Sequence, residues 1–235
     1  MQVLKKIGLF KKKPPSAHLA GSVSTYTQVL EHSFKEIQLD GNKHGTNRDV
    51  ITMALISPSI AVVCVCDGAG LLYWSQVAAF VACNEFVSYM EDYFAQNANT
   101  SSKEVQNALK SAVIHANKKT VTYTLPSGET VHIMDKGGQT TLAAIVVMED
   151  SNGQWNAISI GTGDSECHKL SKDGVWNCMF KNHGEMLPFA GLEEHNIQDA
   201  VVTPCFPEDC IFCVSDGVST SFMDKFPALD LSKSC

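Results

Sequence analysis

The sequence contains a single arginine, Arg48, in 235 residues, and this scarcity excludes two classes of function. Acidic residues outnumber basic ones to give a net charge of −7, whereas nucleic-acid affinity depends on basic groups that displace phosphate counterions. We therefore expect no binding of nucleic acid. A cysteine-based phosphatase would need an arginine five residues after its cysteine to cradle phosphate, and the sequence has no such pattern.

Long apolar runs are missing as well. No stretch of about 18 apolar residues occurs, which is the length that a membrane-spanning helix requires. The apolar residues 7–10, between the N-terminal lysines, are too few for a signal peptide. We expect no transmembrane segment and a cytoplasmic location.

The nine cysteines are an odd number, and no cleavable signal peptide precedes them. Free thiols in a reducing compartment explain this most simply, with several thiols buried as small apolar groups. A zinc site is not expected at Cys205, Cys210 and Cys213, because no second CxxC pair and no paired histidines complete four ligands.

The composition is that of a folded chain, with 44% hydrophobic and 18% charged residues, and its length fits one domain or two small ones. Five lysines lie in the first thirteen residues, which hold no acid: Lys5, Lys6, Lys11, Lys12 and Lys13. We expect residues 1–20 to form a flexible basic tail and residues 21–235 to form the domain. The tail either remains in solvent without a role or contacts an anionic membrane weakly. The acidic remainder suits the binding of cations.

The hydrophobic pattern predicts strands, then two helices, then strands again. Two strands at 50–56 and 60–66 are joined by a turn, and helices follow at 73–96 and 103–119. Ser101 and Glu104 have the spacing of a capping box for the second helix. Further strands are predicted at 121–123, 130–134, 141–148, 155–160, 166–170, 175–180 and 211–215. Since strands and helices do not alternate, we expect an α+β fold, with an antiparallel sheet pair and helices packed outside.

Aspartates stand at the ends of the most apolar strands. Asp-Gly dipeptides begin at residues 40, 67, 173 and 216, and the first and third are expected to be simple turns. Asp67 and Asp216 instead end almost wholly apolar runs, where a carboxylate loses hydration unless a cation or a donor compensates. Mg²⁺ and Mn²⁺ prefer such oxygen ligands. Gly68 and Gly217 would let the backbone turn sharply and bring a carbonyl close to the metal.

Two further aspartates fit this pattern. Asp164 follows the strand predicted at 155–160, and Asp49 opens the first strand. Each alone is typical of a cap or a turn. Four strand-end aspartates in one chain favour a shared metal site over any single assignment.

The chain resembles a known family through five motifs in one order: Asn47-Arg48-Asp49, Asp67-Gly68-Ala69-Gly70, Gly138-Gln139-Thr140-Thr141, Gly161-Thr162-Gly163-Asp164-Ser165 and Ser215-Asp216-Gly217. This order is similar to the metal-dependent serine/threonine phosphatases of type 2C, also called PPM-type, over about residues 40–222. It most resembles the branch whose second motif reads Asp-Gly-Ala-Gly. The resemblance implies a β-sandwich flanked by helix pairs, with a two-metal centre at one end.

The resemblance also implies roles for individual residues. Asp67 would bridge two Mg²⁺ or Mn²⁺ ions, and the Gly68 carbonyl would bind one of them. Asp216 would bind the second ion, and Asp49 would be a ligand or hold a metal-bound water. Asp164 with Asp216 would suit a third, weaker metal site. The implied reaction is attack of a metal-bridging hydroxide on phosphoserine or phosphothreonine, with phosphoproteins as substrates and a monomeric enzyme.

The sequence departs from the family pattern at several points. His44 stands where the family has an arginine that grips phosphate, and we expect His44 to replace it as phosphate ligand or proton donor, beside Asp49. Arg48 replaces an acidic residue, and Ala69 replaces a histidine. Nineteen residues follow Asp216 without an apolar strand, so the last metal ligand and a final strand are expected to be missing. These departures leave an alternative: a catalytically impaired pseudophosphatase that binds phosphoproteins or acts as a scaffold.

Overall fold

The computed structural model describes residues 48–69, 73–124, 128–181, 184–189, 192–193 and 196–216, and the backbone of residues 18–19, 22–29 and 32–37. His44, Gly217 and the chain after Asp216 lie outside them, so the expectations of a missing final strand and a missing last ligand do too.

A five-stranded antiparallel sheet forms the middle layer, in the order β12-β9-β8-β5-β4. Its strands are β4 (Val50–Ser57), β5 (Ile60–Cys66), β8 (Leu142–Glu149), β9 (Trp155–Thr162) and β12 (Val201–Pro204). The central strands β5 and β8 pair with Val62 opposite Val146. Both are apolar on both faces, which fits a sheet covered on each side.

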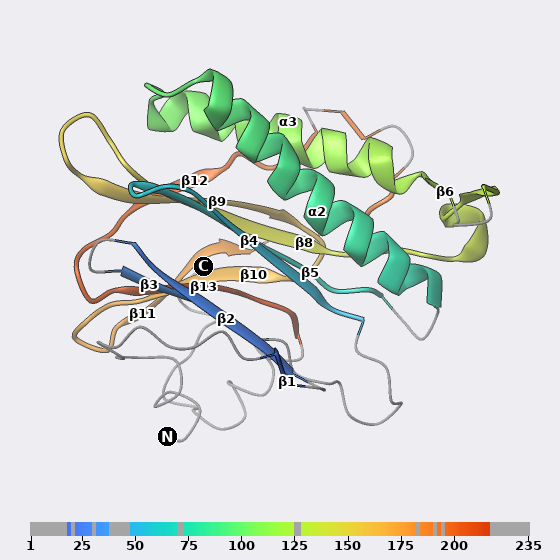
Figure 1. The fold of residues 1–235 in the computed structure, drawn as a ribbon, viewed down its shortest axis with the longest axis horizontal. Coiled ribbons are helices and arrows are strands. Elements are labelled where there is room, and N and C mark those ends of the chain that lie inside the picture. Colours follow the sequence, from blue (N-terminus) through green and yellow to red (C-terminus); the bar gives the residue numbers. More distant parts are fainter. Residues whose placement is uncertain are drawn as a thin grey trace.

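Two helices cover one face of this sheet, as Figure 1 shows: α2 (Tyr73–Gln96) and α3 (Ser102–Thr120). Even-numbered residues of β8 point into this layer, where Val146 packs in one buried cluster with Phe86 and Leu109. The predicted capping box is confirmed. Ser101 Oγ accepts from the Glu104 N–H at 3.3 Å, and the Ser101 N–H donates to Glu104 Oε2 at 2.8 Å.

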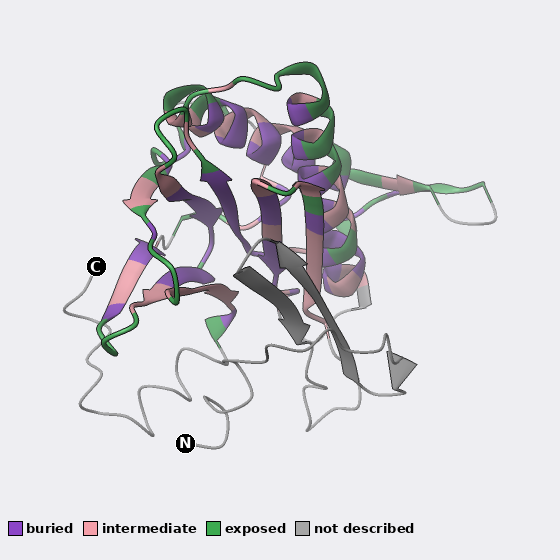
Figure 2. Cartoon of the chain, turned by 60° about the vertical axis from the view of Figure 1, so that its left-hand side comes forward, coloured by how far each residue is buried: buried purple, intermediate pink, exposed green. Residues whose placement is uncertain are grey.

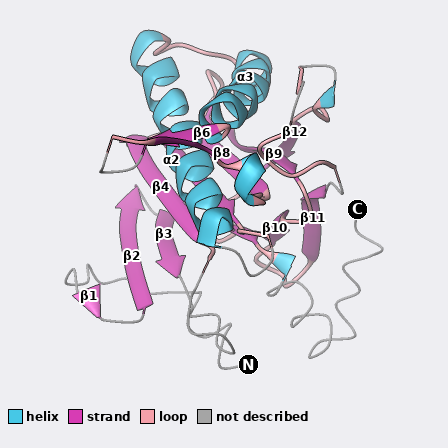
Figure 3. Ribbon diagram, turned by 90° about the vertical axis from the view of Figure 1, so that its right-hand side faces the viewer, coloured by secondary structure: helices cyan, strands magenta, loops and turns pink. Residues whose placement is uncertain are grey.

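A smaller sheet covers the other face, in the order β11-β10-β13 (Figures 1 and 3). It consists of β10 (Glu166–Leu170), β11 (Trp176–Lys181) and β13 (Cys210–Val214). Odd-numbered residues of β8, such as Ile145, pack against Cys167 and Phe180 of this sheet. These described elements therefore form three layers of helices, sheet and sheet, and Figure 2 shows the buried residues concentrated between them.

Peripheral elements complete the described chain. A hairpin pairs β6 (Thr122–Thr124) with β7 (Thr130–His132), followed by a short 3₁₀ helix η1 (Met134–Lys136). A third sheet consists of β1 (His18–Leu19), β2 (Ser22–Val29) and β3 (His32–Ile37). Neither this sheet nor β12 was predicted from the sequence.

The expected fold class is confirmed, with antiparallel sheets, helices outside them and the two central helices as predicted. In the described residues a single helix pair covers a single outer face. Neither of these helices is long and apolar enough to cross a membrane. Seven described cysteines are free thiols, as expected, whereas Cys178 in β11 is disulfide-bonded, which contradicts the expectation at that position.

Candidate metal centre

Three of the predicted aspartates meet at one edge of the central sheet. Strands β4 and β5 pair with Val50 opposite Cys66, so Asp49 before β4 lies across from Asp67 after β5. Asp216 follows β13 of the smaller sheet, and Ser215 Oγ beside it donates to Asp49 Oδ2 at 3.2 Å. That contact joins the ends of the two sheets.

Burial and the convergence of the three aspartates raise the pKa of the Asp67 carboxyl. Burial, and then the negative charges of Asp49 and Asp216, raise the pKa of Asp67 from 3.8 to about 8. A divalent cation would remove both causes, because it replaces lost hydration and neutralises the like charges. The donor set consists of carboxylate oxygens, which are the ligands that Mg²⁺ and Mn²⁺ prefer. The residues present therefore fit a hard divalent ion.

Backbone and hydroxyl contacts hold Asp67 in place. Its N–H donates to Thr141 Oγ1 at 3.0 Å, and its carbonyl accepts from the Thr141 N–H at 2.9 Å and from Thr140 Oγ1 at 2.8 Å. The Thr141 hydroxyl also lies 2.6 Å from Ser165 Oγ, and all three hydroxyl-bearing residues are buried. We call Thr140, Thr141 and Ser165 the Asp67 clamp.

The clamp gives a structural role to two motifs that the sequence marked only by their resemblance to the family. Thr140 and Thr141 belong to the third motif, and Ser165 follows Asp164 in the fourth. Spacing along the chain could not reveal them, because Thr140 and Thr141 bond to a residue more than 70 positions away, and Ser165 contacts Thr141 across 24 positions. A hydroxyl residue at the start of an apolar strand is the only local signal that they carry.

Gly68 is required here for close packing. A Cβ at this position would lie 2.7 Å from the Ser75 carbonyl oxygen and 3.1 Å from that of Arg48. The first contact is too short for any side chain, and it cannot relax easily because the Ser75 oxygen belongs to the backbone. Gly68 thus lets the start of α2 approach the metal-centre edge, which differs from the sharp turn that the sequence suggested.

The other site predictions have different positions. Asp164 lies exposed on the bend between β9 and β10, directly before Ser165 of the clamp. The carboxylates that raise the Asp67 pKa are Asp49 and Asp216, and Asp164 is not among them. Its role in a third metal site stays a prediction, as does the role of His44.

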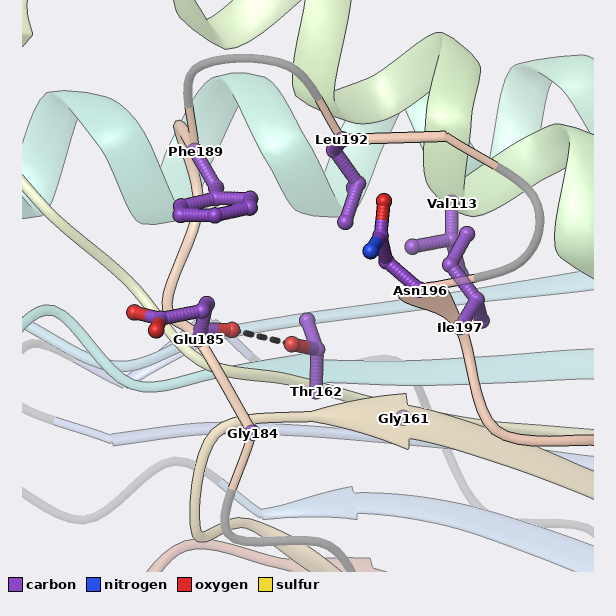
Figure 4. A pocket seen from close by; sticks show the side chains of 9 residues that line it. All are labelled: Val113, Gly161, Thr162, Gly184, Glu185, Phe189, Leu192, Asn196 and Ile197. Atoms are coloured by element: carbon purple, nitrogen blue, oxygen red, sulfur yellow. Dashed lines mark hydrogen bonds between the residues drawn. The ribbon is translucent and has the colours of Figure 1, made fainter.

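A cavity of about 360 Å³ lies beside this edge, between α3, the end of β9 and the described segments 184–189, 192–193 and 196–197 (Figure 4). Val113, Phe189 and Ile197 supply apolar walls, and Thr162 Oγ1 donates to the Glu185 carbonyl. Leu187 in the same segment exchanges backbone hydrogen bonds with Thr140 at 2.7 Å. The cavity wall is therefore joined to the Asp67 clamp by hydrogen bonds, and no local sequence pattern indicates the cavity.

We expect Thr141→Val to destabilise the fold by about 1–3 kcal/mol, because the change keeps the shape and leaves the Asp67 N–H without its acceptor. Urea denaturation of the two proteins measures this difference. Thr124→Val is the matched control, because the Thr124 hydroxyl makes an exposed contact with Thr130 at 3.2 Å. Equal losses in the two variants would show that the clamp does not hold Asp67.

A comparison with models of known protein families identifies the family of this chain. A family model described as "Protein phosphatase 2C" matches residues 43–233, which is more than half of the chain. The chain belongs to the protein phosphatase 2C family. The matched region contains Asp49, Asp67, Asp164 and Asp216. No curated protein matches the chain.

Solved structures resemble the chain at low sequence identity. The serine/threonine phosphatase of S. agalactiae has a TM-score of 0.55 and 14% identity, covering 85% of this chain and 80% of its own. The PPM Ser-Thr phosphatase MsPP of Mycobacterium smegmatis has a TM-score of 0.47 and 20% identity, covering 91% and 88% of the two chains. At 14% identity, the likeness to the S. agalactiae phosphatase shows the fold alone.

Proposed function

We propose that the chain hydrolyses phosphoserine and phosphothreonine in proteins, using Mg²⁺ or Mn²⁺ held by Asp49, Asp67 and Asp216. The observation that carries this proposal is the convergence of the three carboxylates at one edge, which raises the Asp67 pKa to about 8. Membership of the protein phosphatase 2C family supports the reaction class.

Each residue would have a defined part in this site. The Asp67 carboxylate and the Gly68 carbonyl would hold the ions, and the clamp would fix the Asp67 backbone next to them. Asp216 would bind the second ion, and Ser215 would orient Asp49 through the hydrogen bond at 3.2 Å. Asp164 with Asp216 would form the third, weaker site. When bound, the ions activate a water for attack on phosphorus and neutralise charge on the phosphoryl oxygens.

The leaving group and the phosphate need partners too. Ala69 carries no proton to donate, so it cannot assist the leaving group in the way that a histidine could. We propose His44 as the phosphate ligand or proton donor, and we assign the chain to the branch whose second motif reads Asp-Gly-Ala-Gly. We also propose a cytoplasmic monomer that acts on phosphoproteins, with only weak membrane contact through its basic tail.

The test is phosphate release from a phosphothreonine peptide, with Mn²⁺ and with a chelator in its place. We expect turnover that depends on Mn²⁺ and falls at least about 100-fold in Asp67→Asn, because the bridging carboxylate is lost. Asp173→Asn is the matched control, because Asp173 is also followed by glycine but lies exposed in the β10–β11 turn. Its activity should equal that of the wild type.

The outcomes separate the enzyme from a pseudophosphatase. If the folded wild-type chain binds Mn²⁺ and is nevertheless as inert as Asp67→Asn, the proposed hydrolysis is wrong and a phosphoprotein-binding scaffold replaces it. His44→Ala belongs in the same assay. Full activity of that variant would remove His44 from the mechanism while leaving the metal centre in place.

A further inference from the structure

Three cysteines meet in the core directly behind the metal centre. Cys64 and Cys66 point from β5 toward the helices, and Cys83 faces them from α2. Their sulfur atoms all lie within 4.8 Å of one another, and each residue is 0% exposed. We call this group the thiol cluster. Both sheet and helix contribute to it, so its geometry depends on their packing.

The spacing of the sulfurs matches that around a metal ion. With a metal–sulfur distance of about 2.3 Å, two sulfurs bound to one ion lie about 3.8–4.0 Å apart. Cys64 Sγ and Cys66 Sγ are 3.9 Å apart. Cys83 Sγ must move by no more than about 1 Å to complete the triangle, because no pair exceeds 4.8 Å.

Polar backbone atoms accompany the sulfurs in this apolar layer. Cys83 Sγ lies 3.3 Å from the Cys64 carbonyl oxygen and 3.6 Å from that of Val50. Three thiols in one place also differ from the other close sulfur pair, Cys167 and Cys213, which lie 3.8 Å apart in the second core layer. A pair of thiols supplies two ligands, whereas the thiol cluster supplies three.

We propose that Cys64, Cys66 and Cys83 bind one thiophilic metal ion, Zn²⁺ or Cu⁺, at a site separate from the carboxylates. Sulfur ligands select such soft ions, whereas Mg²⁺ and Mn²⁺ prefer oxygen, so the two sites would sort their metals by ligand type. Three sulfurs complete the coordination of Cu⁺, and Zn²⁺ would take a carbonyl oxygen as its fourth ligand. The ion replaces the thiol protons, which leave to solvent, and no electron is transferred.

The thiol cluster lies next to residues of the proposed catalytic edge, so a bound ion would affect that edge. Cys66 directly precedes Asp67, and Cys83 belongs to the helix whose first turn packs against Gly68. A bound ion would fasten α2 to β5 behind the proposed catalytic edge. Because the cluster is fully buried, the ion would enter while the chain folds, and binding would add to the stability of the folded state.

The experiment is refolding of the full chain under reducing conditions with excess Mg²⁺ and either Zn²⁺ or Cu⁺. After gel filtration, elemental analysis should find about one thiophilic ion per chain in at least one arm. Refolding with Co²⁺ should give a thiolate-to-metal charge-transfer absorption, which carboxylates cannot produce. Cys64→Ala combined with Cys83→Ala should abolish both signals. Cys167→Ala combined with Cys213→Ala should leave them unchanged.

Two results would overturn the proposal. One is wild-type protein that folds with Zn²⁺ or Cu⁺ present and retains no more of the ion per chain than the variant that combines Cys64→Ala with Cys83→Ala. The other is bound Co²⁺ without thiolate absorption, which would assign the ion to the carboxylates. If the variant fails to fold, the wild-type spectrum still decides. These readouts do not require phosphatase activity, so they stand apart from the proposed hydrolysis.

Discussion

Asp67→Asn is expected to stabilise the metal-free protein at pH 8 and above. Burial and the charges of Asp49 and Asp216 raise the pKa of the folded-state carboxyl to about 8, whereas its ordinary value is 3.8. The folded state therefore holds the proton more tightly than the unfolded state, and the metal-free fold loses stability as the pH rises from about 4 to about 8. Asparagine carries no charge and escapes this loss. Thermal unfolding in the presence of a chelator, recorded across this range, measures the difference.

Mn²⁺ should reverse the order of the two proteins. The wild type gains about 2.7 kcal/mol of stability when the Mn²⁺ concentration is 100 times the dissociation constant. For a protein of this size, each kcal/mol raises Tm by about 2–4 °C. The variant has lost a ligand and should gain much less. Asp173→Asn, on an exposed turn, should follow the wild type throughout. A metal-free Asp67→Asn that is less stable than the wild type at pH 8 would contradict the carboxylate cluster.

Glu166→Ala is expected to destabilise the protein by about 3 kcal/mol. Glu166 Oε2 accepts from His168 Nε2 at 2.8 Å, and Glu166 Oε1 accepts from Lys181 Nζ at 2.7 Å. Trp176 Nε1 donates to the other ring nitrogen of His168 at 3.1 Å, so that ring donates its own proton to Glu166. His168 is 0% exposed, and removal of the carboxylate leaves its N–H buried without an acceptor.

The same network predicts a dependence on acid. Burial raises the pKa of Glu166, but the contacts with His168 and Lys181 outweigh it and hold the pKa below its ordinary value of 4.5. A carboxyl with a lowered folded-state pKa stabilises above its ordinary pKa and loses that contribution as the pH falls. The difference between wild type and Glu166→Ala should therefore shrink in acid.

An exposed ion pair between two turns beside the same sheet provides the control for this prediction. Lys172 Nζ and Glu208 Oε2 lie 2.6 Å apart, with both side chains more than half exposed. Glu208→Ala should leave the urea midpoint unchanged, because solvent screens such pairs. Equal midpoints for Glu166→Ala and Glu208→Ala would mean that the buried network contributes nothing to stability.

Local patterns in the sequence were sufficient for most of the fold. Periodicity gave α2 with its observed bounds, and the capping box at Ser101 located the start of α3, because these signals come from residues close together in the chain. The strand β12 escaped prediction because it has four residues and includes Pro204. The sheet β1-β2-β3 lies in a stretch where the sequence suggested no strands.

The candidate site also contains residues that the sequence identified and residues that only the tertiary structure brings together. The apolar runs that end at Asp67 and Asp216 identified both residues, and the pairing of Val50 with Cys66 explains why Asp49 faces Asp67. The Asp67 clamp, the cavity and the thiol cluster required tertiary structure. Each joins segments that are distant in the chain, and Cys83 meets Cys64 only because of how α2 is rotated against the sheet.

The position of Mn²⁺ in crystals grown with that ion is the decisive observation for the proposed metal centre. We predict anomalous-scattering peaks among the carboxylates of Asp49, Asp67 and Asp216, and the disappearance of those peaks in crystals of Asp67→Asn. Ordered carboxylates without any peak between them, at Mn²⁺ concentrations that saturate the phosphatase assay, would contradict the assignment of these residues as the metal ligands.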